Sequence, residues 1–208
     1  MLKIWGRTNS INVQKVLWCA DELGLNYQRY DVGGAFGKNQ EPAYLAMNPN
    51  GLVPTLEEED GWLLWESNSI VRYLAAKHKA AVLEPTDLRV RAHAHKWMDW
   101  QLSVLGPAIH GLFWGLVRTP PEKRDHADIE DSKQRTIRAA GMLETQLAKT
   151  KYVASNEFSY GDIPVGIQIY RFVSLAKDRP ATPNLDRWFA AISSRPPFKH
   201  HIGAIPLV

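Results

Sequence analysis

The stretch NPNGLVPTLEEEDGWLLWESNSIVRYL, residues 48–74, decides the fold of this chain. It holds two short apolar runs, residues 53–56 and 62–65, each of a length typical of strands. The Asp60-Gly61 pair between these runs is a turn signal and predicts a β-hairpin. Apolar residues then recur at helical spacing, so the hairpin is expected to lead directly into a helix.

Two features of this stretch indicate a ligand site. Pro54 stands at the start of a strand, where it cannot donate a ladder hydrogen bond, so it leaves neighbouring backbone groups free for a ligand and is compatible with a cis bond. Ser67 or Ser69 can cap the following helix. Free amides at a helix start favour an anion such as a carboxylate.

The residues before this stretch predict a βαβ unit with parallel strands. Residues 2–6 and 27–32 are the expected strands, and the apolar spacing from Ile11 predicts a helix that ends at Gly24. A glycine-rich loop and a short helical piece at 42–47 follow. The first half of the chain is therefore α/β.

Past a predicted linker at 79–86, the sequence turns entirely helical over residues 87–208. A long helix is expected over 87–116, with a bend at Gly106-Pro107, and the next helix is expected to start at Pro121. The second half is accordingly predicted to be all-α.

The segment FSYGDI predicts a further helix start in this half. Ser159 is the expected cap, and Asp162 three residues later forms a variant of the capping box. The last helix is expected over 184–194, ended by Pro196-Pro197.

Composition excludes several classes of function. The 208 residues are 45% hydrophobic with a mean hydropathy of −0.31, and no run suits a membrane span. The net charge of +3 is spread among 22 acidic residues, too weak a bias for nucleic-acid binding. The first residues lack a secretion signal, so the chain is expected in the cytoplasm. The lone Cys19 excludes an internal disulfide and is expected to be buried. His93 and His95 are two residues apart on a predicted helix, so their side chains diverge and no metal site is expected.

The pattern NPxGxVPxL, followed by WES and IxxYL, resembles the glutathione-binding half of the cytosolic glutathione transferases, and the resemblance extends over nearly the whole chain. It is similar to the bacterial, theta-like type. The resemblance implies a thioredoxin-like glutathione-binding domain over 1–78 and an all-helical domain over 87–208 that contributes the electrophile site. It also implies a homodimer, glutathione as co-substrate and a role in detoxification.

The resemblance further implies which residues hold glutathione. Val53 and Pro54 would hold the cysteinyl backbone, and Glu66 and Ser67 the γ-glutamyl end. Asn39 falls where related proteins contact the glycine carboxylate.

A donor to the thiol is expected in the loop after the first strand. A free thiol has a pKa of about 8.5, and lowering it by two units corresponds to roughly 2.7 kcal/mol of stabilisation of the thiolate. By resemblance Ser10 is the donor, although it could equally serve as a helix cap. Thr8, Asn9 and Asn12 are competing donors, and the sequence leaves the choice open.

Phe113 and Trp114 are candidate apolar walls of the electrophile pocket, with packing in the core as the alternative for each. The predicted reaction is attack of glutathione thiolate on a small electrophile, with halogenated acids or amides as a specific hypothesis. A glutathione-dependent isomerase or peroxidase, and a non-catalytic binding or assembly module, are the alternatives.

Overall fold

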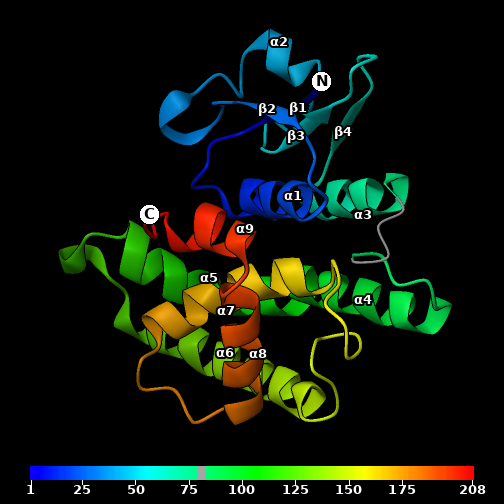
Figure 1. Ribbon diagram of the computed structural model, residues 1–208. Helices are drawn as coiled ribbons and strands as arrows, with labels where there is room; N and C mark the ends of the chain where they lie inside the picture. Colours follow the sequence, from blue (N-terminus) through cyan, green and yellow to red (C-terminus); the bar gives the residue numbers. More distant parts are fainter. Residues whose placement is uncertain (79–82) are drawn as a thin grey trace. The chain divides into compact units, whose positions relative to one another are not determined.

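The computed structural model describes residues 1–78 and 83–208. These residues form two compact units (Figure 1). The first comprises Met1–Glu84 and Pro196–Ile205, and the second comprises Pro85–Arg195 and Pro206–Val208. Four residues of the predicted linker at 79–86, namely 79–82, lie outside the described residues.

The first unit is built on a four-stranded mixed sheet with the strand order β2-β1-β3-β4. The strands are β1 (Leu2–Trp5), β2 (Tyr27–Tyr30), β3 (Thr55–Glu57) and β4 (Leu63–Trp65). β1 pairs parallel with β2 and antiparallel with β3, which pairs antiparallel with β4. The parallel pair confirms the predicted βαβ unit, since parallel strands need a crossover and α1 supplies it.

Three helices complete this α/β layer: α1 (Ile11–Glu22), α2 (Pro42–Leu45) and α3 (Ser67–Lys77). Figure 1 shows α1 and α3 side by side along one face of the sheet, with α2 on the other side. The apolar face of α1 contributes to the core of this unit, since Val13, Val16 and Leu17 recur at a helical spacing and are buried.

The end of the chain packs back on the first unit. α9 (Pro196–Phe198) begins at the Pro196-Pro197 pair, which suits a first helical turn. The ring of Phe198 packs edge-on against Trp18, with 5.2 Å between centroids, and His201 Nε2 lies 2.7 Å from Asp21 Oδ2. These contacts explain why residues 196–205 group with the first unit.

The predicted hairpin forms as expected. The amide of Glu58 donates to the carbonyl of Trp62, the Asp60 side chain accepts from the amide of Trp62, and Gly61 takes the positive φ of 88° that favours glycine. The expected cap at the start of α3 is wrong, because Ser67 is the first helical residue and Glu66 precedes it.

The second unit is helical, and no strand occurs in its described residues. Its helices are α4 (Leu88–Trp100), α5 (Gly106–Phe113), α6 (His126–Leu147), α7 (Asp162–Leu175) and α8 (Pro183–Ser193). α6 packs along α5, and α8 packs against α6 and α7. None of the helices in the described ranges has the length and apolar content of a membrane span.

One predicted helix boundary in this unit is wrong. At the predicted bend, a π-helical segment at Gln101–Leu105 directly precedes Gly106, because Pro107 has no N–H for the carbonyl four residues before it. Pro121 starts only a short 3₁₀ turn. The next helix, α6, begins after Asp125, whose side chain accepts from the two amides that follow and so caps the helix.

The start of α7 is built around a fully buried carboxylate. Asp162 accepts from the Ser159 amide at 2.9 Å, as the capping-box pattern predicts, and also from the Val153 amide and the Trp188 indole. Burial raises the pKa of Asp162 to about 6, against the effect of these donors. The carboxylate therefore ties the loop before α7 to α8.

Candidate functional site

A small cavity of about 40 Å³ opens in the first unit, where the hairpin stretch meets the starts of α1 and α3. Its lining is mainly polar and consists of Asn12, Asn48, Asn50, Leu52, Val53, Pro54, Glu66 and Ser67. The peptide bond between Val53 and Pro54 is cis. The cavity thus unites five of the residues that the sequence predicts for glutathione binding and catalysis.

The loop before β3 is fixed by two buried side chains. The carbonyl of Leu52 accepts from the Tyr44 hydroxyl at 2.7 Å and from Asn48 Nδ2 at 2.8 Å. Asn48 Oδ1 accepts from the amide of Asn50, and the Tyr44 hydroxyl also lies 2.9 Å from Thr55 Oγ1. Burial raises the pKa of the Tyr44 phenol, so this donor stays protonated at neutral pH. The network holds the Val53-Pro54 peptide in place from both ends.

The other wall of the cavity is the start of α3. Glu66 has a φ of 75°, an uncommon conformation for a residue with a side chain, and such residues cluster at functional sites. Its side chain is exposed and forms no hydrogen bond or ion pair with any residue that the structure describes. Ser67 is buried and its hydroxyl donates to Asn12 Oδ1 at 3.4 Å, which links α3 to α1. The carboxylate of Glu66 is therefore available to a ligand.

The loop that the sequence predicts to activate a thiol is only partly in the cavity wall. Asn12 lines the cavity, whereas Thr8 and Ser10 do not. Ser10 holds the position before α1 and is 7% exposed. Among the described residues, no amide of α1 donates to its hydroxyl, so the side chain does not act as the helix cap that was the alternative role.

The remaining predicted residues lie elsewhere. Asn39 does not line the cavity but donates from Nδ2 to the carbonyl of Gly51 at 2.7 Å, next to the lining residue Asn50. Phe113 and Trp114 belong to the helical unit, where Phe113 is 5% exposed and Trp114 is 54% exposed. Phe113 therefore packs in the core of its unit, and Trp114 lies at the surface.

The single thiol of the chain takes no part in this cavity. Cys19 is buried, as predicted, and its Sγ lies 3.7 Å from the carbonyl of Val71. Burial raises the pKa of the thiol, which keeps it in the unreactive protonated form. No group of His, Cys, Asp and Glu suited to a metal ion occurs in the described part of the chain.

Sequence reasoning missed three lining residues, Asn48, Asn50 and Leu52. All three fall inside the stretch 48–74, and the NPNG turn is the signal that could have identified them. An asparagine that bonds backbone two residues on is typical of such turns, and the loop it builds is the edge of the cavity.

Both halves of the chain match known family models. Residues 9–77 match the model described as glutathione S-transferase, N-terminal domain. Residues 105–196 match the model described as glutathione S-transferase, C-terminal domain. The two matches correspond to the sheet unit and to the helical unit.

Individual relatives agree with these matches over nearly the full length. The glutathione S-transferase GstB of Escherichia coli K12 is 44% identical, over 94% of this chain and 95% of its own. Glutathione S-transferase 3 of Zea mays is 32% identical, over 99% of this chain and 95% of its own. The theta-class glutathione S-transferase of Xanthomonas axonopodis pv. citri was solved with glutathione bound. It superimposes with a TM-score of 0.93 at 43% identity, over 100% of this chain and 99% of its own. The thioredoxin-like domain and the helical domain predicted from sequence are those of this fold, and the chain belongs to the glutathione S-transferase family.

Proposed function

We propose that this chain binds glutathione in the cavity of the first unit and catalyses attack of the glutathione thiolate on a small electrophile. The observation that carries the proposal is that Asn12, Val53, Pro54, Glu66 and Ser67 line a single cavity. The Xanthomonas relative, which has glutathione bound, supports the choice of ligand.

The chemistry of the lining suits the two charges at the γ-glutamyl end of glutathione. Its carboxylate would accept from the Ser67 hydroxyl and from the amides at the start of α3, where the helix dipole favours an anion. Its ammonium group would pair with the exposed carboxylate of Glu66. The peptide body would then lie along the Val53-Pro54 backbone.

Activation of the thiol is assigned to the loop before α1. A hydroxyl or amide group that donates to sulfur favours the thiolate, because hydrogen bonds to the charged form lower a pKa. Ser10 has a hydroxyl that is not used as a cap, and Asn12 lines the cavity. We assign the donor to Ser10, with Asn12 and Thr8 as the alternatives.

Titration calorimetry with glutathione at millimolar concentration tests the binding step. Heat of binding is expected for the natural sequence, and absence of heat would contradict the site assignment. Turnover with haloacetates, haloacetamides and aromatic halides then tests catalysis. Binding without turnover of any electrophile, peroxide or isomerisable substrate would favour the non-catalytic module.

We also propose that the chain acts as a homodimer in the cytoplasm and serves detoxification, as is typical of its family. Light scattering of the purified protein at micromolar concentration is expected to give twice the mass of one chain, 23.6 kDa. A monomer mass that persists as the concentration is raised would contradict the dimer.

A further inference from the structure

One residue that lines the cavity of the first unit has a side-chain amide whose orientation is fixed by the fold. Asn50 donates to Asn48 Oδ1 twice, from its backbone N–H and from Nδ2, at 3.1 Å in both cases. Asn48 is buried, and its own Nδ2 donates to the carbonyl of Leu52 at 2.8 Å. A carbonyl can only accept, so Asn48 must turn Nδ2 toward Leu52 and Oδ1 toward Asn50. The side chain of Asn50 therefore turns its NH₂ group toward Asn48.

The carbonyl oxygen of the same amide is left for another partner. Within residues 1–78 and 83–208, no group donates to Asn50 Oδ1. The side chain is exposed and forms part of the cavity lining. Oδ1 and Nδ2 diverge from one carbon, so Oδ1 does not face Asn48. An amide oxygen accepts and cannot donate, so Asn50 offers a ligand in the cavity a hydrogen-bond acceptor.

The backbone of Val53 offers a donor and an acceptor beside it. In the described ranges, neither the N–H nor the carbonyl of Val53 bonds to another group of the chain. Such a residue can pair with one residue of an extended peptide, in the manner of a strand added to a sheet edge. Val53 and Asn50 together thus offer one donor and two acceptors, a set suited to a ligand that carries consecutive peptide groups.

The hairpin indicates which part of glutathione would meet Asn50. Thr55 pairs with Trp65, so Val53 and Pro54, just before Thr55, lie next to Glu66 and Ser67, just after Trp65. A ligand with its γ-glutamyl end at Ser67 and its cysteinyl residue along Val53 extends its glycine toward the loop before Val53. Asn50 belongs to that loop.

We propose that Asn50 Oδ1 accepts a hydrogen bond from the N–H that joins cysteine to glycine in glutathione. Asn50 then determines specificity, because it selects thiol peptides that continue past the cysteine with an amide N–H. This inference rests on the proposed function, which assigns glutathione to the cavity.

Asn48 is a positioning residue in this arrangement, since it acts on the ligand through Asn50. Without Asn48 the amide of Asn50 could turn over and present its NH₂ group, which donates to an oxygen of the ligand instead. The bond from Asn50 Nδ2 to Asn48 Oδ1 excludes that orientation. A site built to accept from a ligand N–H discriminates against an analogue that lacks this group, because the acceptor is then left unpaired.

The test compares glutathione with its ester analogue, in which oxygen replaces the N–H between cysteine and glycine. The natural sequence should bind the analogue about tenfold more weakly, measured by titration calorimetry. Asn50→Leu should weaken glutathione binding about tenfold and change the affinity for the analogue less than about threefold, so that the preference disappears. Asn26→Leu, at an exposed position of the same unit, is the matched control and should change neither affinity.

The ratio of the two affinities separates a contact with the ligand from a role in loop structure. If Asn50 only shaped the loop, Asn50→Leu would weaken both ligands in parallel, and that result would overturn the proposal. Equal binding of both ligands by the natural sequence would also overturn it, although the proposed function would stand. If the natural sequence bound neither ligand, the proposed function and the role of Asn50 would both be wrong.

Asn48→Ala tests the positioning role separately. Asn50 is intact in this variant, but its amide can turn, so the preference for glutathione over the ester should fall from about tenfold to below about threefold. Because both ligands are measured on the same variant, any general loosening of the loop cancels in the ratio. A tenfold preference that persists in Asn48→Ala would show that Asn48 does not orient Asn50.

Discussion

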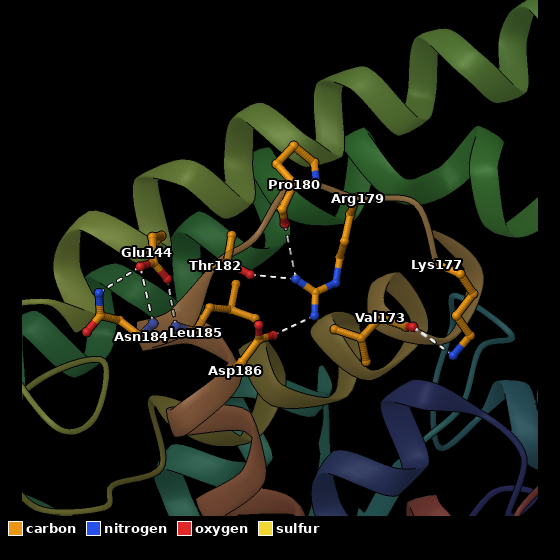
Figure 2. A network of polar contacts seen from close by, with 9 residues as sticks. All are labelled: Glu144, Val173, Lys177, Arg179, Pro180, Thr182, Asn184, Leu185 and Asp186. Carbon is orange, nitrogen blue, oxygen red and sulfur yellow. Dashed lines mark hydrogen bonds and ion pairs between the residues drawn. The ribbon is translucent and has the colours of Figure 1, made fainter.

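The starts of helices α8 and α3 differ in how their free amides are used. At α8 the carboxylate of Glu144, reaching over from α6, accepts from the amides of Asn184 and Leu185 and from the Asn184 side chain (Figure 2). At α3 the residue before the helix, Glu66, makes no such bond with the described residues, and Ser67 faces a cavity. One helix start is closed by the protein's own carboxylate. At the other, the side chain of the residue before the helix provides no cap.

We propose that this difference distinguishes a structural carboxylate, Glu144, from a ligand-binding one, Glu66. Both helices begin with amides that need a partner, because the first four N–H groups of a helix have none within it. Glu144 meets that need inside the fold and so contributes to stability. Glu66 does not cap the amides of α3, and we propose that a ligand carboxylate binds them instead. Substitutions at the two sites should therefore separate stability from affinity.

The largest effect is expected for Glu144→Ala. It removes the acceptor of three hydrogen bonds at the start of α8, and we expect the free energy of unfolding to fall by about 2–3 kcal/mol. Urea unfolding followed by circular dichroism measures this change. The affinity for glutathione, measured by calorimetry, should stay within about twofold. A variant as stable as the natural protein would show that the Glu144 cap is not structural.

The opposite pattern is expected for Glu66→Gly. Glycine adopts the φ of 75° without steric cost, so the free energy of unfolding should stay the same or rise by up to about 1 kcal/mol. Loss of the carboxylate should weaken glutathione binding about tenfold, because a charge-assisted hydrogen bond is lost. Glu122→Gln, at an exposed acid of the helical unit, is the control and should change neither quantity. Unchanged affinity in Glu66→Gly would remove Glu66 from the binding site.

The helix starts also show what the sequence could predict. The hairpin at Asp60-Gly61 and the bond from the Ser159 amide to Asp162 were predicted correctly, because each depends on residues that are neighbours in the chain. The cap by Glu144 was not predicted, since its partners come from another helix far along the sequence.

The start of α3 was predicted in position but not in detail. The WES motif indicated a helix that begins near Ser67, which the structure bears out. The positive φ of Glu66 could not be predicted, because the turn from β4 into α3 is imposed by the packing of both elements rather than by local preference. The same holds for the π-helical segment before Gly106, where the effect of Pro107 extends back over the preceding turn. The assignment of the thiol donor stays a prediction.

A smaller effect on activity is expected for Ser10→Ala. If the hydroxyl donates to the thiolate, its loss should raise the pKa of bound glutathione and lower kcat/KM at pH 6.5 by about tenfold. Stability should change by less than about 1 kcal/mol, since the side chain accepts no bond from the described amides of α1. Asn12→Ala is the matched comparison. Full turnover in Ser10→Ala with a loss in Asn12→Ala would transfer the role to Asn12.

The smallest effect concerns the charge of Glu144 and appears only as a function of pH. Burial acts to raise the pKa of Glu144, but the amide of Leu185 and the side chain and amide of Asn184 together hold it below the usual value. The native state therefore binds fewer protons than the unfolded state, whose glutamates have a pKa of about 4.3. The stability that this group contributes is present above about pH 4.3 and is lost as the pH falls through the native pKa.

Other carboxyl groups titrate in the same range, and Asp162, with a pKa raised to about 6, contributes with the opposite sign. The difference between the natural protein and Glu144→Gln cancels these groups. Urea unfolding of both between pH 6 and pH 3 should show the natural protein more stable at pH 6, and the gap should shrink as the pH falls. A difference in the free energy of unfolding that is constant or widens toward pH 3 would mean that the amides at the start of α8 do not stabilise the charge of Glu144. The contrast between the starts of α8 and α3 would then rest on hydrogen bonding alone.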